Sequence, residues 1–209
     1  KTALPFDATL RQAFAAFVEE AMMAFGLPGA AVAVVQGGKV VYEQGFGVRQ
    51  QGRPVRVTPA TLFMIGSTTK SLTSLLIARL VDEGKFGWDT PVTQLYPAFA
   101  LGDPEATKRI AMKHTVCACT GLPRQDMEFL FEYAGISAEQ RLASMRTMKP
   151  TTGFGETFQY SNLLVSTGGF VAGHCLSPKL KLAAAYDLAI RTRILGPLGM
   201  KATTFDPAA

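Results

Sequence analysis

Residues 62–70 of this 209-residue chain are Leu-Phe-Met-Ile-Gly-Ser-Thr-Thr-Lys, and the helical pattern that they introduce continues to about Glu83. Gly84 follows as a natural stop, because glycine favours the left-handed conformation that ends many helices. The periodicity predicts a buried helix that begins at Ser67 and carries Lys70 on the same face. The apolar residues that define its buried side are Leu72, Leu75, Leu76, Leu80 and Val81.

Ser67 and Lys70 form the only S-x-x-K of the chain. At a helix start, residues i and i+3 share a face, so the hydroxyl and the amine can come within hydrogen-bonding distance. A serine alcohol is a weak nucleophile until a neighbouring base takes its proton, and the N–H groups of a helix start can stabilise an oxyanion. A serine N-cap followed by an exposed lysine explains the same letters, so this motif alone leaves both interpretations open.

Tyr160-Ser161-Asn162 is the second candidate motif, and it lies between a loop over residues 150–159 and an apolar helix. A nearby ammonium group lowers the pKa of a phenol and makes it a candidate base. The amide of Asn162 can bond both a lysine and a substrate carbonyl. The alternative is a helix entry, in which Ser161 or Asn162 caps the helix and Tyr160 packs against it.

The N-terminal part of the chain has a different pattern. Residues 7–25 place apolar side chains at helical spacing, which predicts an amphipathic helix. Residues 30–35 and 40–48 are apolar, β-branched runs joined by a turn at residues 36–39, which is typical of a β-hairpin. No further hairpin pattern follows. The later helices are expected at residues 88–96, 106–117, 128–133, 138–148, 163–173 and 180–195.

The two motifs together resemble those of the penicillin-recognising serine hydrolases of the class C β-lactamase type. That family includes D-Ala-D-Ala carboxypeptidases, D-aminopeptidases and related esterases. The resemblance extends over nearly the whole chain, in the family's order. The matching segments are the hairpin at residues 30–48, the nucleophile segment at 62–70 and an H-T-S-G-L-P-like turn at 114–123. They continue with a G-x-x-F-x-Y-S-N segment at 155–162 and a P-L-G-M helix end at 195–200. Phe154 stands where proline usually precedes the fourth of these segments.

The resemblance implies a role for each candidate residue. Ser67 would be the nucleophile that forms an acyl-enzyme, with Lys70 and Tyr160 as the coupled proton-transfer pair. Asn162 would orient the lysine and bind the substrate amide, and Gln125 occupies the place of a substrate-contacting glutamine. The neighbouring arginine could bind a substrate carboxylate, although a solvent-facing side chain is the favoured interpretation.

The resemblance also implies an α+β fold, with a helical domain and part of an antiparallel sheet flanked by helices. Residues 1–60 would form the N-terminal helix and hairpin of the α/β domain, residues 61–200 the mainly helical domain with both motifs, and residues 201–209 a lead-in to further strands. The family's K-T-G or H-x-G strand is not found after Asn162. We therefore expect a complementary C-terminal polypeptide to supply it, unless these residues are part of a longer chain.

The composition of the chain disfavours several classes of function. The net charge is +5 and the basic residues are scattered, which disfavours a nucleic-acid surface. No segment is long and apolar enough for a membrane span, and without a leader the chain is either cytoplasmic or processed, with a periplasmic or secreted location slightly favoured. Three cysteines and two histidines are poorly suited as a set of zinc ligands, so we expect no metal site. We expect the cysteines to be small buried residues. The cysteines are Cys117, Cys119 and Cys175.

These observations predict a serine hydrolase that acts through an acyl-enzyme on an amide or ester carbonyl. A small-molecule or peptide substrate is expected, and no organic cofactor is required. A peptidase or an esterase is favoured over a true β-lactamase, because pocket shape rather than motif decides among these activities. The alternative is a non-catalytic or penicillin-sensing scaffold with the same fold, which the absence of the third motif favours.

Overall fold

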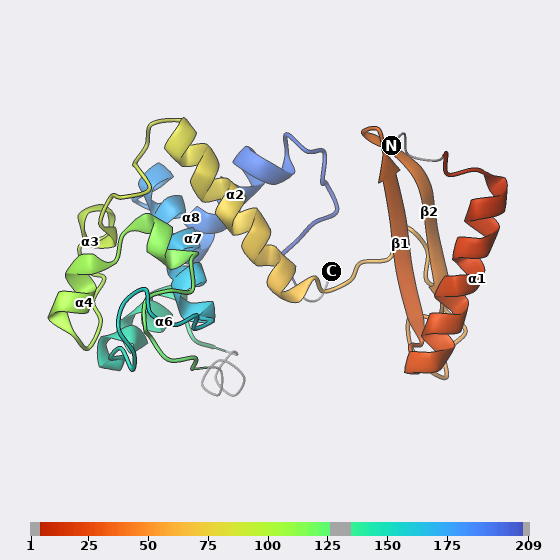
Figure 1. Cartoon of the computed structure of the whole chain (residues 1–209). Coiled ribbons are helices and arrows are strands. Elements are labelled where there is room, and N and C mark those ends of the chain that lie inside the picture. Colours follow the sequence, from red (N-terminus) through yellow and green to blue (C-terminus); the bar gives the residue numbers. More distant parts are fainter. Residues whose placement is uncertain (1–4, 126–134, 207–209) are drawn as a thin grey trace. The chain divides into compact units, whose positions relative to one another are not determined.

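The computed structural model describes residues 5–125 and 135–206. The chain divides into two compact units, an N-terminal unit of Lys1–Met64 and a C-terminal unit of Ile65–Ala209. Figure 1 shows a helix and two strands in the first unit and a group of helices in the second. The described part is therefore a mixed helix and antiparallel-sheet fold, as the sequence predicts.

The N-terminal unit is one helix packed on one hairpin. Helix α1 (Ala8–Phe25) is capped by the Asp7 carboxylate, which accepts a hydrogen bond from the N–H of Leu10 at 2.9 Å. Strands β1 (Gly29–Gln36) and β2 (Lys39–Gly47) pair antiparallel, which confirms the predicted hairpin. Gly37 and Gly38 in the turn have φ of +59° and +74°, a region that glycine adopts without steric cost. The helix contacts the hairpin through edge-to-face packing of Phe6, Phe14 and Tyr42.

The central helix of the C-terminal unit is α2 (Thr69–Asp82), preceded by a short 3₁₀ turn, η1 (Gly66–Thr68). Ser67 lies in this turn, which runs directly into α2, so the α-helix begins two residues after the predicted start. The predicted buried side of this helix included Leu75, but the side chain of Leu75 is 47% exposed. The residues that the helix buries are Thr73, Leu76, Ile77 and Leu80.

The other helices are mostly shorter than the periodicity predicts. The helix expected at 106–117 is interrupted at Ile110 and Ala111, where the backbone is extended and Ala111 forms a bridge with Pro91. The helix expected at 128–133 lies outside the described residues. The observed elements are α3 (Val92–Leu95), α4 (Pro104–Arg109), η2 (Met112–Thr115), α6 (Ala138–Ser144), η3 (Met145–Thr147), α7 (Asn162–Leu176), α8 (Leu182–Ile190) and the π-helical turn η4 (Arg191–Leu195).

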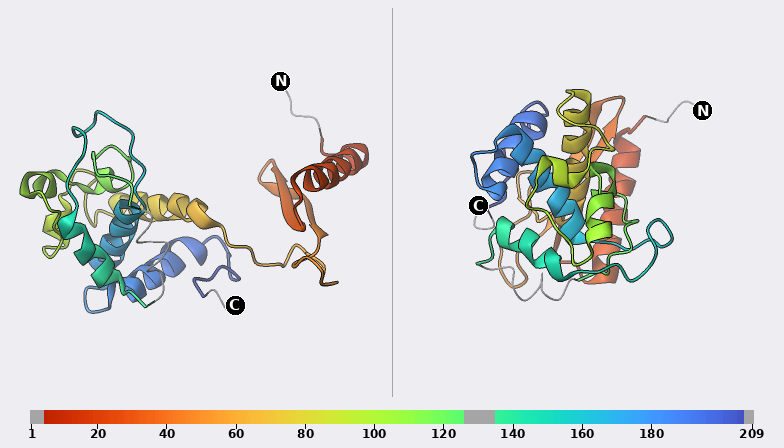
Figure 2. Two further views of the ribbon diagram at one scale, coloured as in Figure 1. Left: turned by 90° about the horizontal axis from the view of Figure 1, so that it is seen from below. Right: turned by 90° about the vertical axis from the view of Figure 1, so that its left-hand side faces the viewer.

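Helix α7 contacts both α2 and α8 and forms the middle of this unit (Figure 2). Glycines make the close approach possible. A Cβ on Gly173 would lie 2.6–2.7 Å from backbone atoms of Ala185 and Tyr186 in α8, closer than such atoms can approach. Leu164 and Val171 of α7 are fully buried in the same core as Leu76, Ile77 and Leu80.

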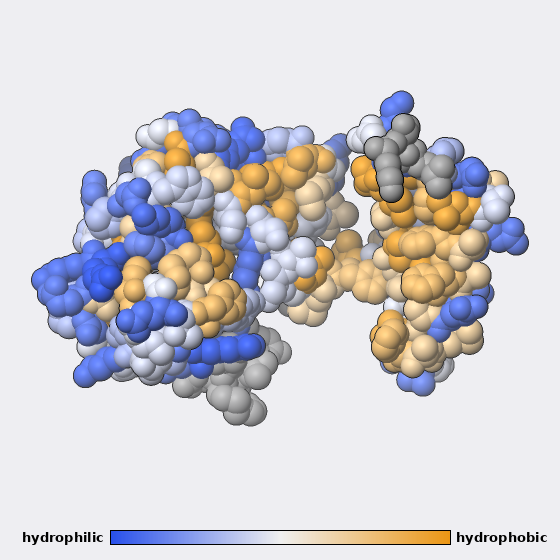
Figure 3. Space-filling view, in the orientation of Figure 1, coloured by the Kyte–Doolittle hydropathy of each residue, from blue (hydrophilic) through white to orange (hydrophobic). Residues whose placement is uncertain are grey.

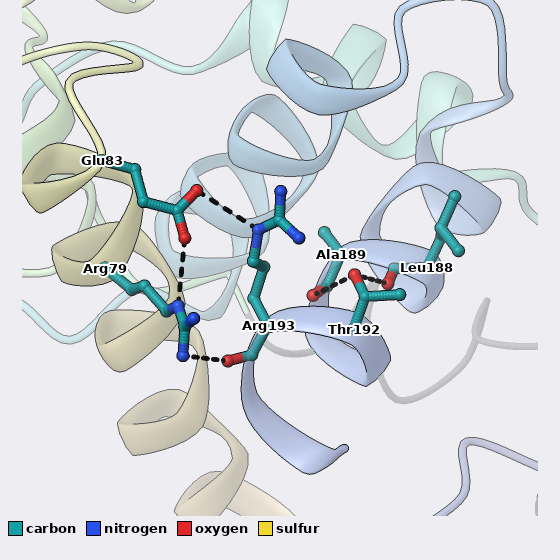
Figure 4. Close-up of polar contacts among 6 residues, drawn as sticks. All are labelled: Arg79, Glu83, Leu188, Ala189, Thr192 and Arg193. Atoms are coloured by element: carbon teal, nitrogen blue, oxygen red, sulfur yellow. Dashed lines mark hydrogen bonds and ion pairs between the residues drawn. The ribbon is translucent and has the colours of Figure 1, made fainter. Parts of the chain in front are cut away.

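The C-terminal end of α2 is held by polar contacts with η4 (Figure 4). Arg79 donates to the carboxylate of Glu83 at 3.1 Å and to the carbonyl oxygen of Arg193 at 2.9 Å. Arg193 donates in turn to the other carboxylate oxygen of Glu83 at 3.3 Å. These groups are partly exposed, so the contacts fix the end of the helix more than they stabilise the fold.

The cysteines differ from the prediction. Cys117 and Cys119 form a disulfide, and Cys117 is exposed rather than buried. Cys175 is a free, half-buried thiol on α7. Cys117 and Cys119 are only two positions apart, and disulfides across so short a loop are uncommon. The sequence pattern therefore does not indicate that they pair. In the part of the chain that the structure describes, no helix has the length and apolar character needed to cross a membrane.

Candidate active site

Four of the predicted site residues are joined by hydrogen bonds in the C-terminal unit. The hydroxyls of Ser67 and Tyr160 lie 2.7 Å apart. The amine of Lys70 donates to Ser67 Oγ at 3.0 Å and to Asn162 Oδ1 at 2.7 Å. The expected convergence of these side chains is therefore observed, although they come from positions more than 90 residues apart along the chain.

Two local structures bring the four residues together. Ser67 lies in the 3₁₀ turn η1, and Lys70 follows in the first turn of α2. Tyr160 and Asn162 flank Ser161, the N-cap of α7, whose hydroxyl accepts a hydrogen bond from the N–H of Leu164 at 3.2 Å. The capping interpretation of the Tyr-Ser-Asn motif is thus correct for Ser161, while its two neighbours in the chain contact Ser67 and Lys70.

The Ser67 oxygen makes two hydrogen bonds. Lys70 donates to it, and in the bond with Tyr160 either hydroxyl can be the donor. The lysine amine also lies 4.7 Å from the centre of the Tyr160 ring, close enough for a cation–π contact.

The environment of Tyr160 favours its ionised form. Burial raises the pKa of Tyr160, but the neighbouring Lys70 and Ser67 groups and the charges of Lys70 and Arg124 outweigh it, so the net pKa lies below its usual value. Arg124 contributes from above, because its guanidinium lies 5.2 Å from the centre of the same ring. A larger fraction of Tyr160 is therefore ionised at a given pH than of an unperturbed phenol.

A cavity of about 530 Å³ opens beside these residues. It lies between one face of α2 and one face of α7, because its lining residues recur at helical spacing on both. Ser67, Lys70, Asn162 and Arg124 contribute its polar lining. The remaining lining residues are Gly66, Thr69, Thr73, Val165, Ser166, Gly169, Phe170 and Tyr186.

Tyr186 of α8 is one of the lining residues that the sequence did not indicate. Its hydroxyl and that of Thr73 are 2.8 Å apart, and its ring packs edge-on against Phe170. Burial raises the pKa of Tyr186, so it remains a neutral phenol. It lies more than 100 residues from Thr73 along the chain, and no local pattern signals such a contact.

The turn at residues 114–123 supports the site from one side. His114 Nδ1 accepts a hydrogen bond from the N–H of Ala111 at 3.0 Å, and its ring packs edge-on against Phe154, the residue that replaces the family's proline. Burial lowers the pKa of His114, and the charge of Lys113 lowers it further, so the imidazole is neutral at pH 7.

Gln125 is half-buried and is not among the described residues that line the cavity. Its neighbour Arg124 lines the cavity and is exposed, in agreement with the favoured interpretation of a solvent-facing side chain. Within the described residues, no three His, Cys, Asp or Glu side chains are grouped as metal ligands would be.

Comparisons with known proteins show the family to which the chain is similar. The family model described as Beta-lactamase matches residues 14–209. The chain is 35% identical over 201 residues to the unguisins hydrolase ungD' of Aspergillus campestris, which covers 93% of this chain and 36% of that protein. It is 28% identical over 187 residues to protein flp of Staphylococcus aureus strain MW2, which covers 86% of this chain and 35% of that protein.

Solved structures are similar as well. The octameric penicillin-binding protein homologue from Pyrococcus abyssi has a TM-score of 0.75 and 28% identity, over 93% of this chain and 44% of that one. A class C beta-lactamase has a TM-score of 0.76 and 22% identity over 96% of this chain and 52% of that one, which shows the shared fold. The chain thus spans about half, or less, of the length of the proteins that it matches.

Proposed function

The chain belongs to the beta-lactamase family, and on this premise we propose that it is a serine hydrolase that acts through an acyl-enzyme on an amide or ester carbonyl. The observation that carries the proposal is the hydrogen-bonded chain from Asn162 through Lys70 and Ser67 to Tyr160. A serine alcohol becomes a strong nucleophile only beside a base, and in this series of hydrogen bonds Tyr160 is the proposed base.

The proposed reaction has two halves. Tyr160, as a phenolate, takes the proton of Ser67 while the serine oxygen attacks the carbonyl carbon of the substrate. The phenol then gives that proton to the leaving amine or alcohol, which leaves an ester on Ser67. In the second half, Tyr160 takes a proton from a water molecule that attacks this ester and returns it to the serine. Lys70 holds its charge beside the phenolate throughout, and Asn162 fixes Lys70.

The cavity suggests the part of the substrate that lies beside Ser67. Its lining includes Val165, Gly169, Phe170 and the ring of Tyr186, which suit an apolar group. We infer that an apolar acyl group or side chain occupies this space while its carbonyl carbon lies at Ser67. This lining favours a peptidase or esterase over an enzyme for small polar amides.

We also propose that further polypeptide completes the site, as the sequence analysis expected. The described part of the chain holds a two-stranded sheet, in which each strand has one edge without a partner strand. An additional strand of the K-T-G or H-x-G kind would extend an antiparallel sheet and supply a backbone N–H for the oxyanion. The share of the relatives' length that this chain spans supports this part of the proposal.

Labelling with a fluorescent fluorophosphonate, which reacts with activated serines, tests the proposal. We expect one label on Ser67, none in Ser67→Ala, and normal labelling in the matched variant Ser71→Ala, which removes an exposed serine of α2. Hydrolysis of p-nitrophenyl esters then measures turnover. Labelling without turnover would indicate a sensing scaffold, and an unlabelled folded protein would contradict the proposal.

A further inference from the structure

The turn at residues 117–119 is hydrogen bonded to the segment that carries Tyr160. The N–H of Gln159 donates to the carbonyl oxygen of Ala118 at 2.8 Å, and the N–H of Gly155 donates to the carbonyl oxygen of Cys119 at 2.8 Å. Gln159 directly precedes Tyr160 in the chain. The Ala118 carbonyl therefore helps to set the position from which the phenol reaches Ser67.

Ala118 itself has an unusual backbone conformation. Among the described residues it is the one non-glycine residue with a positive φ, at +53°. The left-handed region is unfavourable for alanine, because its Cβ comes too close to the neighbouring carbonyl oxygen. Some other constraint must therefore keep Ala118 there.

A disulfide joins Cys117 and Cys119, the two residues that flank Ala118. It closes a small ring around Ala118 and restricts the backbone conformations that this residue can adopt. Without the ring, Ala118 is free to return to the extended or right-handed regions, which turns its carbonyl away from Gln159.

A second cavity connects the same turn with the proton-transfer pair. It has a volume of about 200 Å³, and its lining includes Cys117, Ala118, Lys70 and Tyr160. A change in the turn therefore alters the space against which Lys70 and Tyr160 pack. Cys117 is exposed, so a small thiol in solution can reach it.

We propose that the Cys117–Cys119 disulfide positions Tyr160, and that its reduction by a small-molecule thiol slows acylation of Ser67. The inference rests on the proposed role of Tyr160. A thiolate attacks the exposed sulfur of Cys117 and forms a mixed disulfide with it, while Cys119 leaves as a thiolate and takes up a proton. A second thiol group then attacks the mixed disulfide and releases Cys117 as a thiol. Two electrons and two protons pass to the protein, and the reductant leaves as its own disulfide.

The test compares oxidised and dithiothreitol-reduced protein by two readouts. The first is the rate of fluorophosphonate labelling at Ser67, which we expect to fall about tenfold on reduction, because displacements of about 1 Å cost up to about 10²-fold. The rate should return on reoxidation. The double variant Cys117→Ser/Cys119→Ser should be labelled slowly, at a rate that dithiothreitol does not change. Cys175→Ser should be labelled at the wild-type rate and respond to dithiothreitol as wild type does.

The second readout is amide hydrogen exchange at Gln159 and Gly155, which does not depend on activity. We expect exchange at both amides to accelerate on reduction while the core of α7 keeps its protection. Unchanged exchange, or equal labelling rates in the two redox states, would overturn the inference. If the oxidised protein does not label at all, the proposed function fails, and the exchange rates alone decide whether the disulfide positions this segment.

Discussion

The hydroxyl of Ser67 lies between an amine that donates to it and a phenol that can accept from it. The proposed mechanism divides the chemistry between two side chains. In it, Lys70 supplies charge and orientation, and Tyr160 supplies the atom that exchanges protons with the substrate. The two roles are separable by substitution, since the phenol oxygen can be removed without altering the amine.

Tyr160→Phe is the substitution that tests this division. We expect it to lower the acylation rate by about 10²–10⁴-fold, the usual contribution of a positioned acid or base. Folding should be preserved, because the ring remains and the lost hydroxyl is only half-buried. Single-turnover labelling and thermal unfolding measure the two effects, with Tyr42→Phe in the N-terminal unit as the control. A near-normal acylation rate in Tyr160→Phe would exclude the phenol as the base.

Arg124 makes a second prediction possible, on the pH dependence of acylation. If the ionised phenol is the base, the rate rises with pH through the lowered pKa of Tyr160. The Arg124 charge contributes to that lowering, so its removal raises the pKa and moves the rising limb to higher pH. We expect the limb to move upward in Arg124→Met and to stay nearly in place in Arg124→Lys. A downward shift in Arg124→Met would contradict the assignment.

Sequence motifs identified the residues that hydrogen bond at the site but not its wall. Ser67, Lys70, Tyr160 and Asn162 are recognisable because each belongs to a short pattern with a fixed spacing. The contact of Tyr186 with the cavity depends on how α8 packs on α7, and side-chain packing of distant segments leaves no local pattern. The pairing of the two nearby cysteines was missed for a different reason, because so short a loop is uncommon.

Helix α7 serves both the site and the core. Its first turn carries Asn162 at the site, and its later turns are buried between α2 and α8. Its sequence reflects the close packing, since Gly168, Gly169 and Gly173 are all buried. Substitutions in this helix therefore have effects that depend on the turn in which they fall.

Ser161→Ala removes the N-cap of α7. We expect it to lower the free energy of unfolding by about 1 kcal/mol, the usual cost of losing a serine cap. Acylation should persist, because Ser161 does not contact the reacting groups in the proposed mechanism. Urea denaturation gives the stability, with Ser177→Ala beyond the other end of α7 as the control. Loss of acylation in a fully folded Ser161→Ala protein would show that the cap has a direct role.

Ser166 lies on the face of α7 that lines the large cavity. Ser166→Leu should fill part of this space, while Ser166→Ala removes only the hydroxyl and leaves the volume open. We expect the leucine variant to lose roughly tenfold or more in kcat/KM for long-chain p-nitrophenyl esters relative to the acetate, since a methylene in such a pocket is worth about 10–200-fold. An equal effect on short and long esters would place the acyl group elsewhere.

The predicted elements were most accurate where the periodicity was long and clear. The hairpin and the helices α1, α2 and α7 were predicted within a few residues, because each has a regular apolar face or a defined turn. The segment at 106–117 was wrong as a single helix, since Ile110 and Ala111 leave the helix to pair with residues near Pro91. Tertiary hydrogen bonds of this kind override local helical preference.

The N-terminal unit leaves much apolar surface uncovered. Helix α1 has no buried residue, and Phe17, Met23 and Phe25 are 64%, 75% and 79% exposed. Val35 and Val40 of the hairpin are also exposed, and Figure 3 shows apolar residues across this unit. An isolated two-stranded hairpin is only marginally stable in water, and its open edges invite pairing with another strand. The proposed additional strands would cover apolar surface of this unit and pair with the open edges of the hairpin.

The composition of the active protein tests the proposed completion. We expect purified protein with esterase activity to contain polypeptide beyond residue 209, either continuous with this chain or as a second chain that copurifies with it. Intact-mass spectrometry under denaturing conditions distinguishes these two cases, and native mass spectrometry gives the assembly. If further strands are required, the isolated 209-residue chain should bind a hydrophobic dye strongly and hydrolyse esters slowly, because it would lack the strand that extends the sheet and the N–H that binds the oxyanion. A monomer with the mass of this chain alone, fully active and without dye binding, would contradict the proposal that further strands are required.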